Sequence, residues 1–287
     1  MPQSRIVSNA ARATGSVAPM LIEPLGVARP IGVFDSGLGG LTVLRAVIDL
    51  LPTTSTIYFG DTGRFPYGPK PADEVLKYSL EISDLLIDRE VGLLVIACNS
   101  ATSVALDALS SRYEIPVIGV VEPGVRAAAA VTETGRVGVI GTVGTIASGA
   151  YQRAAMLEGV DLTCSACPGF VEFVESGDVG SDQVHVLAER LLEPVRRAGI
   201  DTLILGCTHY PLLARTIADV MGPEVVLVSS ADETAFEALR LVSTGSPTAS
   251  IPVIHHFVTS GDPQVFAELG GRFLGPEVRD VEGWQWS

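Results

Sequence analysis

The chain has 287 residues, of which 47% are hydrophobic, and its length and composition favour a compact α/β protein of one or two domains. Its formal net charge of −14 argues against a broad surface for direct nucleic-acid binding, because acidic side chains repel phosphates. No apolar run reaches the roughly 18 residues that a membrane helix needs, so we expect no membrane association.

Residues 1–28 are predicted to form a flexible tail. Prolines and a glutamate interrupt its apolar part, so it does not resemble a secretory signal. The chain has too few cysteines for a disulfide scaffold, and we expect free thiols in a reducing cytoplasm. The cysteines are Cys98, Cys164, Cys167 and Cys207.

Strands and helices are predicted to alternate along the first half. Short apolar runs bounded by glycine or proline indicate buried strands, and apolar residues at helical spacing indicate helices. The predicted strands are 31–35, 55–60, 91–97 and 115–122, and the predicted helices are 41–51, 72–90 and 101–113. A loop with glycine and proline at both ends is predicted at 60–70.

The alternation then restarts, which predicts parallel sheets with helices on both faces. The segment after 168 is predicted to be a loop that carries Glu172 and Glu175. Ser230 and Glu233 have capping-box spacing before a further helix, and a strand and a last helix follow. The other predicted helices are 122–134, 142–157, 181–199 and 208–221, and the other strands are 136–141, 160–168 and 201–206.

The two halves look like copies of one βα unit. The stretch IGVFDSG at 31–37 aligns with VGVIGTV at 137–143, and LLVIAC, ending at Cys98, aligns with LILGC, ending at Cys207. We therefore predict an α/β protein of two pseudosymmetric domains, each a mainly parallel sheet flanked by helices. The part after 229 is too short for a third domain, so the predicted domains are 29–123 with 229–287, and 124–228.

Cys98 and Cys207 each follow the carboxyl end of a predicted strand, the edge at which open α/β sheets bind ligands. A helix is expected after each cysteine, and its positive end would lower the thiol pKa. Two thiols across a cleft suit proton transfer at carbon, with a base on one face and an acid on the other. A redox disulfide is one alternative, and small buried cysteines that only end apolar strands are another.

Polar side chains surround both cysteines. Asp35 is expected either to accept from a substrate ammonium or to cap the next helix, and Ser36 to donate to a carboxylate. His209 is expected either to exchange a proton with Cys207 or to be structural. The remaining uncharged donors, which can bind a small carboxylate without a lysine, are Asn99, Ser100, Thr102 and Thr208.

Three other sequence patterns do not favour a nucleotide-binding, metal or redox site. The turns GLGG and GTVGT match neither the dinucleotide fingerprint nor the P-loop. Cys164 and Cys167 lack the second pair that a zinc site needs, so a redox or metal role is not favoured. His255 and His256 have no acidic partner at ligand spacing, and structural packing is favoured.

A series of motifs between residues 31 and 275 resembles the cofactor-independent aspartate/glutamate racemase family. DSGLGG, PYG and GCTHYPLL resemble its glutamate-specific members in particular. The full series is GVFDSGLGGLTVL, YFGDTGRFPYG, IACNSAT, PVIGVVEPG, GVIGTVGTIASGAY, FVEFVESG, LILGCTHYPLL and TSGDPQVFAELGGRFLG. The resemblance implies two pseudosymmetric domains with the active site in the cleft between them.

The resemblance also implies roles for particular residues. Cys98 matches the thiol that abstracts the α-proton from D-glutamate, and Cys207 matches the thiol that acts on L-glutamate. Asp35 and His209 match groups that assist these transfers, and Glu175 matches a glutamate near the second thiol. The positions that match the substrate lining are Asp35, Ser36, Pro66, Tyr67, Gly68, Asn99, Ser100, Thr142 and Thr208.

The implied activity is the interconversion of L- and D-glutamate without pyridoxal phosphate, metal or another cofactor, in the bacterial cytoplasm, which supplies D-glutamate for peptidoglycan. A homodimer is implied as well, and some family members inhibit DNA gyrase, so gyrase binding is a candidate second role. A glutamate α-proton is far less acidic than a thiol, so we expect closure of the domains to exclude water from the site. An aspartate or broad-specificity racemase and a thiol–disulfide oxidoreductase are the alternatives.

Overall fold

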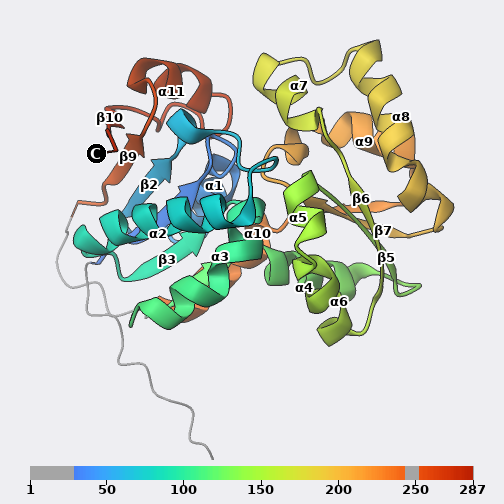
Figure 1. The fold of residues 1–287 in the computed structure, drawn as a ribbon, viewed down its shortest axis with the longest axis horizontal. Helices are drawn as coiled ribbons and strands as arrows, with labels where there is room; N and C mark the ends of the chain where they lie inside the picture. The colour runs from blue at the N-terminus through green and yellow to red at the C-terminus, as the bar shows by residue number, and fades with distance from the viewer. Residues whose placement is uncertain (1–28, 243–251, 287) are drawn as a thin grey trace, which may run out of the picture.

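The computed structural model describes residues 29–242 and 252–286, so the predicted tail at 1–28 lies outside the described residues. Two parallel sheets lie side by side, each with helices on both faces (Figure 1). This is the predicted α/β architecture. None of the described helices is both long and apolar enough to cross a membrane.

The first sheet has the strand order β10-β9-β2-β1-β3-β4, and all its neighbours pair in parallel. Side chains alternate across it, so Val33 and Val95 pack toward α1 and α10, while Phe34 and Ile96 pack toward α2 and α3. Its strands are β1 (Ile31–Asp35), β2 (Thr56–Gly60), β3 (Leu93–Ile96), β4 (Val117–Gly119), β9 (His255–Thr259) and β10 (Glu282–Gly283). Its helices are α1 (Leu41–Leu50), α2 (Ala72–Asp88), α3 (Asn99–Arg112), α10 (Ala231–Leu241) and α11 (Pro263–Gly270), with a 3₁₀ turn, η1 (Thr62–Arg64).

The second sheet has the order β6-β5-β7-β8 and is also parallel throughout. The helices α4 and α6 cover one face, and α7, α8 and α9 cover the other. The strands are β5 (Arg136–Gly141), β6 (Asp161–Ala166), β7 (Thr202–Gly206) and β8 (Val226–Val228). The helices are α4 (Val121–Val131), α5 (Val143–Ala147), α6 (Ala150–Glu158), α7 (Phe170–Ser176), α8 (Asp182–Arg197) and α9 (Ala214–Met221), with a 3₁₀ turn, η2 (Tyr210–Leu213).

The strand orders confirm the predicted duplication. The arrangement β2-β1-β3-β4 of the first sheet recurs as β6-β5-β7-β8 in the second, so β3 and β7, the strands before the two cysteines, occupy equivalent positions. The part of the chain after 252 returns to the first sheet, where β9 pairs with β2, as expected for a segment too short to fold alone. The domain boundaries at 123 and 228 stay a prediction.

Several helix boundaries follow from ordinary capping chemistry. Ser181 accepts a hydrogen bond from the backbone of Val184 at the start of α8, and Asp262 caps α11, which has Pro263 in its first turn. The predicted capping box at Ser230 is wrong, because the Ser230 side chain makes no cap bond. Instead, the Thr234 hydroxyl donates to the Ser230 carbonyl at 2.7 Å.

The predicted loop after residue 168 is also wrong, because that segment forms the short helix α7. Phe170, Val171 and Val174 are buried on one side of α7 against the second sheet, and this packing stabilises a helix too short to persist alone. Glycines with left-handed backbone angles, Gly169 and Gly177, bound it at both ends.

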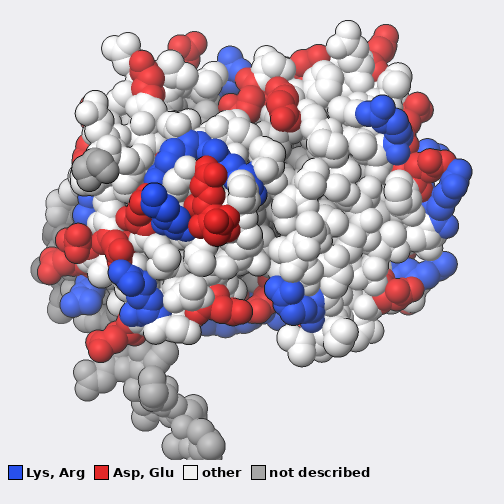
Figure 2. Space-filling model, in the orientation of Figure 1, with Lys and Arg blue, Asp and Glu red and all other residues white. Residues whose placement is uncertain are grey.

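Acidic and basic side chains are interspersed over the face drawn in Figure 2, and this view shows no broad area of basic side chains among the described residues. Many of the charges pair with one another. Arg112 contacts Asp84 at 3.0 Å between α3 and α2, and Arg126 pairs with Glu237 between α4 and α10. Each ion pair uses one acidic and one basic group, so the pairs neutralise charge locally while the net excess of acidic groups stays.

We expect Gly40→Ala to destabilise the fold. A Cβ at Gly40 would lie 2.6 Å from the Asp35 Cβ and 2.9 Å from the Tyr58 hydroxyl, in a buried turn that cannot widen without moving β1. Overpacking of this kind costs about 1–3 kcal/mol of unfolding free energy, which urea denaturation would measure. Gly180→Ala is the matched control, because a Cβ there meets nothing within 4 Å. Equal stabilities of the two variants would contradict this packing argument.

Candidate active site

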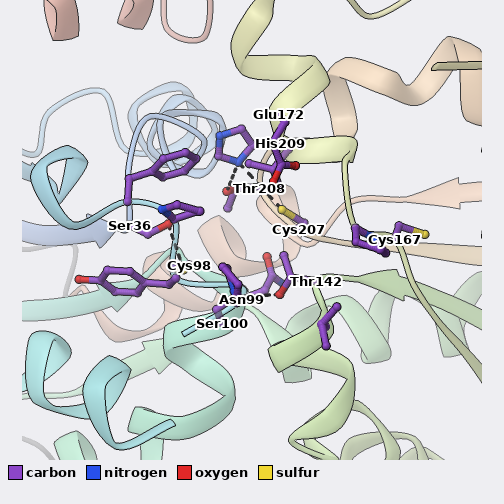
Figure 3. A pocket seen from close by; sticks show the side chains of 18 of the residues that line it. Ser36, Cys98, Asn99, Ser100, Thr142, Cys167, Glu172, Cys207, Thr208 and His209 are labelled. Atoms are coloured by element: carbon purple, nitrogen blue, oxygen red, sulfur yellow. Dashed lines mark hydrogen bonds between the residues drawn. The ribbon is translucent and has the colours of Figure 1, made fainter. Parts of the chain in front are cut away.

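The two sheets direct the carboxyl ends of their central strands toward one pocket. Cys98 lies two residues beyond the end of β3 and begins α3, where its carbonyl accepts from the Thr102 N–H at 2.8 Å. Cys207 directly follows β7. Both cysteines are buried, and Figure 3 shows them entering the pocket from the first and second sheets respectively.

The pocket encloses about 650 Å³ of empty space, including its part open to solvent. It contains every predicted site residue except Asp35, Thr102 and Glu175, together with several that the sequence did not indicate. The Thr102 hydroxyl instead donates to the Ile96 carbonyl at 2.9 Å, so the prediction that it is a substrate donor is wrong. Its lining comprises Ser36, 65–69, 98–100, Thr142, Val143, 167–169, Val171, Glu172 and 206–209. The lining contains no lysine or arginine, so hydroxyl, amide and backbone groups supply most of its hydrogen-bond donors.

Cys98 is held as a neutral thiol in this structure. Burial raises its pKa well above the usual range, and the negative charge of Asp35 raises it further. The Ser36 hydroxyl is its side-chain hydrogen-bond partner, at 3.7 Å. The sequence-based expectation of a lowered thiol pKa is therefore wrong for Cys98, because desolvation outweighs the positive end of α3.

Asp35 lies behind the pocket wall and does not line the pocket. Its side chain is fully buried, and Oδ2 accepts from the backbone N–H groups of Gly37 and Gly40, at 3.3 and 2.9 Å. These bonds fix the Gly-rich turn between β1 and α1, although the N-cap of α1 is Gly40 and not Asp35. Its Oδ1 has no hydrogen-bond partner among the described residues. Asp35 thus acts on Cys98 through its charge and not through a direct bond.

Cys207 has a different partner from Cys98. The His209 Nδ1 lies 4.0 Å from the Cys207 sulfur, and the His209 Nε2 lies 2.7 Å from Glu175 Oε1. Burial alone would lower the pKa of His209, but its hydrogen bonds with Cys207 and Glu175 raise it to about 10. A protonated imidazole therefore stands beside the second thiol.

The expected helix directly after Cys207 is replaced by a tighter arrangement. The Tyr210 N–H donates to the Cys207 carbonyl at 3.1 Å, and the 3₁₀ turn η2 comes before α9 begins at Ala214. The turn places His209 beside the sulfur, and the full helix lies further along the chain. The group nearest the Cys207 sulfur is therefore His209, and not the N-terminus of a helix.

Hydrogen bonds join the two halves directly beside the cysteines. Asn99 Nδ2 donates to the Tyr151 hydroxyl at 2.8 Å, and the Ser100 hydroxyl lies 3.1 Å from both Thr142 and Thr145. Asn99 and Ser100 therefore have structural partners in addition to lining the pocket. A buried tyrosine hydroxyl requires a partner, but the sequence does not reveal that the partner of Tyr151 lies in the other half.

The sequence analysis did not predict most of the pocket residues that the second half contributes. Glu172 places a carboxylate at the pocket from α7, the segment predicted as a loop, and Cys167 also lines the pocket (Figure 3). Cys164 packs on the opposite face of the second sheet, so the two cysteines of the C-x-x-C pattern do not share a site. His255 is a packing residue, as predicted, with Nδ1 3.0 Å from the Thr56 hydroxyl.

Comparison with known proteins agrees with this geometry. The family model for Asp/Glu/hydantoin racemases matches residues 39–238. The chain is 54% identical over 256 residues to a glutamate racemase of Acidothermus cellulolyticus, covering 88% of this chain and 97% of that one. Two crystal structures superpose with a TM-score of 0.83 over 90% of this chain and 97% of each of theirs. One is isoform RacE1 of Bacillus anthracis glutamate racemase, at 40% identity, and the other is a Francisella tularensis glutamate racemase in complex with D-glutamate, at 33%.

The fold and the paired thiols thus define an amino-acid racemase, which is an isomerase. The chain belongs to the Asp/Glu/hydantoin racemase family.

The raised pKa of His209 predicts a loss of stability in alkaline solution. Its pKa is about 10 in the fold against 6.5 for an unperturbed histidine, so the folded state holds the proton more tightly. The resulting stabilisation is complete below about pH 6.5 and is lost as the pH rises through about 10. We expect the unfolding free energy to fall over this window, and to fall less in Glu175→Gln, which lacks one of the bonds that raise the pKa.

Urea denaturation at a series of pH values measures this slope. His185→Gln is the matched control, because His185 is 43% exposed and contacts Glu189 only at the surface, at 3.8 Å. The control should keep the wild-type slope. An unchanged slope in Glu175→Gln would show that the carboxylate does not hold the proton on His209.

Proposed function

We propose that the protein is a glutamate racemase that moves the α-proton between Cys98 and Cys207. The main support is that two cysteines, which follow equivalent strands of different sheets, line the same pocket. One thiolate takes the proton from one face of the α-carbon, leaving the electron pair on carbon, and the other thiol donates a proton to the opposite face. The two sulfurs exchange protonation states, and nothing is oxidised or reduced.

Neutral donors would hold the two substrate carboxylates. The pocket contains four serine or threonine hydroxyls and an asparagine amide but no lysine or arginine, so the protein provides local hydrogen bonds in place of a cation. The same donors stabilise negative charge that develops on the α-carboxylate after proton removal. The donor side chains are Ser36, Asn99, Ser100, Thr142 and Thr208. Pro66, Tyr67 and Gly68 form part of the wall around them.

Substrate binding would also activate Cys98. The charge of Asp35 contributes to the raised pKa of this thiol. The α-ammonium of glutamate beside Cys98 would offset that charge and favour the thiolate. We assign Cys98 to proton abstraction from D-glutamate on the resemblance to the family, with Asp35 assisting from behind the wall.

Cys207 would abstract the α-proton from L-glutamate. His209 supports this role because its raised pKa keeps it protonated, with Nδ1 4.0 Å from the Cys207 sulfur, where it can exchange a proton with the thiol. Glu175 lies outside the pocket lining but holds the outer nitrogen of His209 at 2.7 Å. In this proposal Glu175 is a positioning residue and His209 is the group next to the thiol.

The physiological role we propose is cytoplasmic supply of D-glutamate for peptidoglycan. The D-glutamate complex of the Francisella tularensis relative supports the choice of substrate. The homodimer, the gyrase contact and the closure of the two halves on substrate stay predictions.

We expect wild-type protein in D₂O to exchange the α-hydrogen of both glutamate enantiomers and to convert each into the other. Cys98→Ser and Cys207→Ser should each lower conversion by about 10²–10⁴-fold, the usual contribution of a positioned acid or base. Proton NMR of the α-position follows exchange, and circular dichroism follows conversion. Cys164→Ser is the matched control, because Cys164 is a free cysteine that does not line the pocket.

The same assay separates the alternatives. Exchange with aspartate at a comparable rate would indicate a broad-specificity racemase. Reduction of insulin disulfides without α-hydrogen exchange would indicate a thiol–disulfide oxidoreductase. Full conversion by the Cys98→Ser protein would rule out the two-thiol mechanism.

A further inference from the structure

The pocket wall at residues 65–69 rests on a buried carboxylate. Asp61, which directly follows β2, is fully buried and accepts from the side chains of Arg64, Tyr67, Ser260 and Trp286. The Arg64 Nε bond is 2.8 Å, the Ser260 bond 2.6 Å and the Trp286 bond 3.2 Å. Asp61 therefore connects the loop that carries Tyr67 to the last segment of the described chain.

Arg64 makes a second connection between the loop and that segment. Its guanidinium carbon lies 3.9 Å from the ring centres of both Tyr78 and Trp286, so the group is held between two aromatic faces. Arg64 also pairs with Glu81 on α2. With 14% of its side chain exposed, this cation is mostly shielded from water, which strengthens each of these contacts.

The last segment, 282–286, is attached to the edge of the first sheet. Its backbone pairs with β9 in parallel, and the Trp284 N–H donates to the Thr259 carbonyl at 2.7 Å. Arg89 forms a bidentate ion pair with Glu282, donating two hydrogen bonds at 3.0 and 2.6 Å. The Trp286 ring packs on Phe59 with ring centres 5.5 Å apart. The segment thus has an ordered position against the outside of the loop.

The other end of the same wall is tied to the second half. The Gly144 N–H, in α5, donates to the Gly68 carbonyl at 3.0 Å. A Cβ on Gly68 would lie 2.7 Å from the Thr142 Cβ, so the wall approaches α5 as closely as glycine allows. The wall is therefore fixed at Asp61 on one side of the pocket and at Gly144 on the other.

We propose that segment 282–286 is a positioning element for the substrate. Trp286 contacts Asp61 and Arg64, and Asp61 in turn fixes the position of Tyr67 in the pocket wall. Glutamate binding is thereby coupled to the packing of Trp286. This proposal rests on the proposed function, since glutamate is the ligand that the wall would contact. Neither thiol touches the segment, so its loss should weaken binding and leave the proton-transfer groups in place.

Trp286→Phe tests the coupling, with Trp284→Phe as its matched control. Trp286→Phe loses the hydrogen bond to Asp61 and part of the aromatic surface that packs on the Arg64 guanidinium. Trp284→Phe keeps both, because the Trp284 nitrogen has no partner among the described residues and its ring meets Trp286 edge-on. For Trp286→Phe we expect about a tenfold rise in the KM for glutamate, with kcat changed by less than about twofold. A tenfold rise is the scale expected for the loss of one buried polar or cation–π contact. Trp284→Phe should keep the wild-type KM.

Fluorescence gives a readout that loss of stability alone would not move. The sequence has two tryptophans, both in this segment, so Trp284→Phe leaves Trp286 as the single indole. Racemic glutamate, which is already at equilibrium, should change its emission with a midpoint close to the KM, because coupling is reciprocal. Unchanged emission at saturating glutamate, or equal KM values in both variants, would overturn the positioning role. An inactive wild type would instead contradict the proposed function.

Discussion

The pocket depends on a small set of hydrogen bonds that join the two halves at the start of α3. Ser100 meets Thr142 and Thr145, and Asn99 meets Tyr151, within a few residues of Cys98. Each hydroxyl or amide is buried or nearly so, where an unpaired polar group would be costly. The bonds therefore specify one orientation of the two sheets, and that orientation places both thiols on a common pocket. A substrate that inserts its carboxylates among the same groups would compete with or extend this network.

Duplication of the fold has not produced two identical half-sites. Both cysteines follow equivalent strands, but Cys98 has a buried carboxylate behind it, while Cys207 has a protonated imidazole beside it. Burial and the negative charge of Asp35 favour the neutral thiol of Cys98, whereas Cys207 has the protonated His209 as its neighbour. The two sulfurs therefore lie in different electrostatic surroundings. A racemase needs one acid and one base at a time, and unequal surroundings of the two thiols suit that requirement.

The sequence was informative wherever a signal was local. Apolar runs located the central strands, the repeated cysteine pattern located the paired edges, and the family motifs located Ser36, Tyr67 and Thr208 at the pocket. It failed where the direction of a side chain or its tertiary packing decides the outcome. Asp35 has the right position in the chain, but hydrogen bonds from the Gly37 and Gly40 N–H groups direct its carboxylate into the wall and away from the pocket. α7 was missed because burial against the second sheet, and not intrinsic propensity, stabilises it.

The raised pKa of Cys98 shows why electrostatics could not be inferred from secondary structure alone. A helix end near a sulfur contributes a modest stabilisation of the thiolate, and it is easily recognised in a sequence. Burial of the same sulfur opposes ionisation more strongly, and its extent depends on the side chains that share its buried cluster, Tyr67 and Ala101 among them. The ionisation of Cys98 is therefore determined by tertiary packing and by the charge of Asp35. In our proposal Asp61 and Trp286 act on substrate binding through the position of the pocket wall, and not on the ionisation of the thiols.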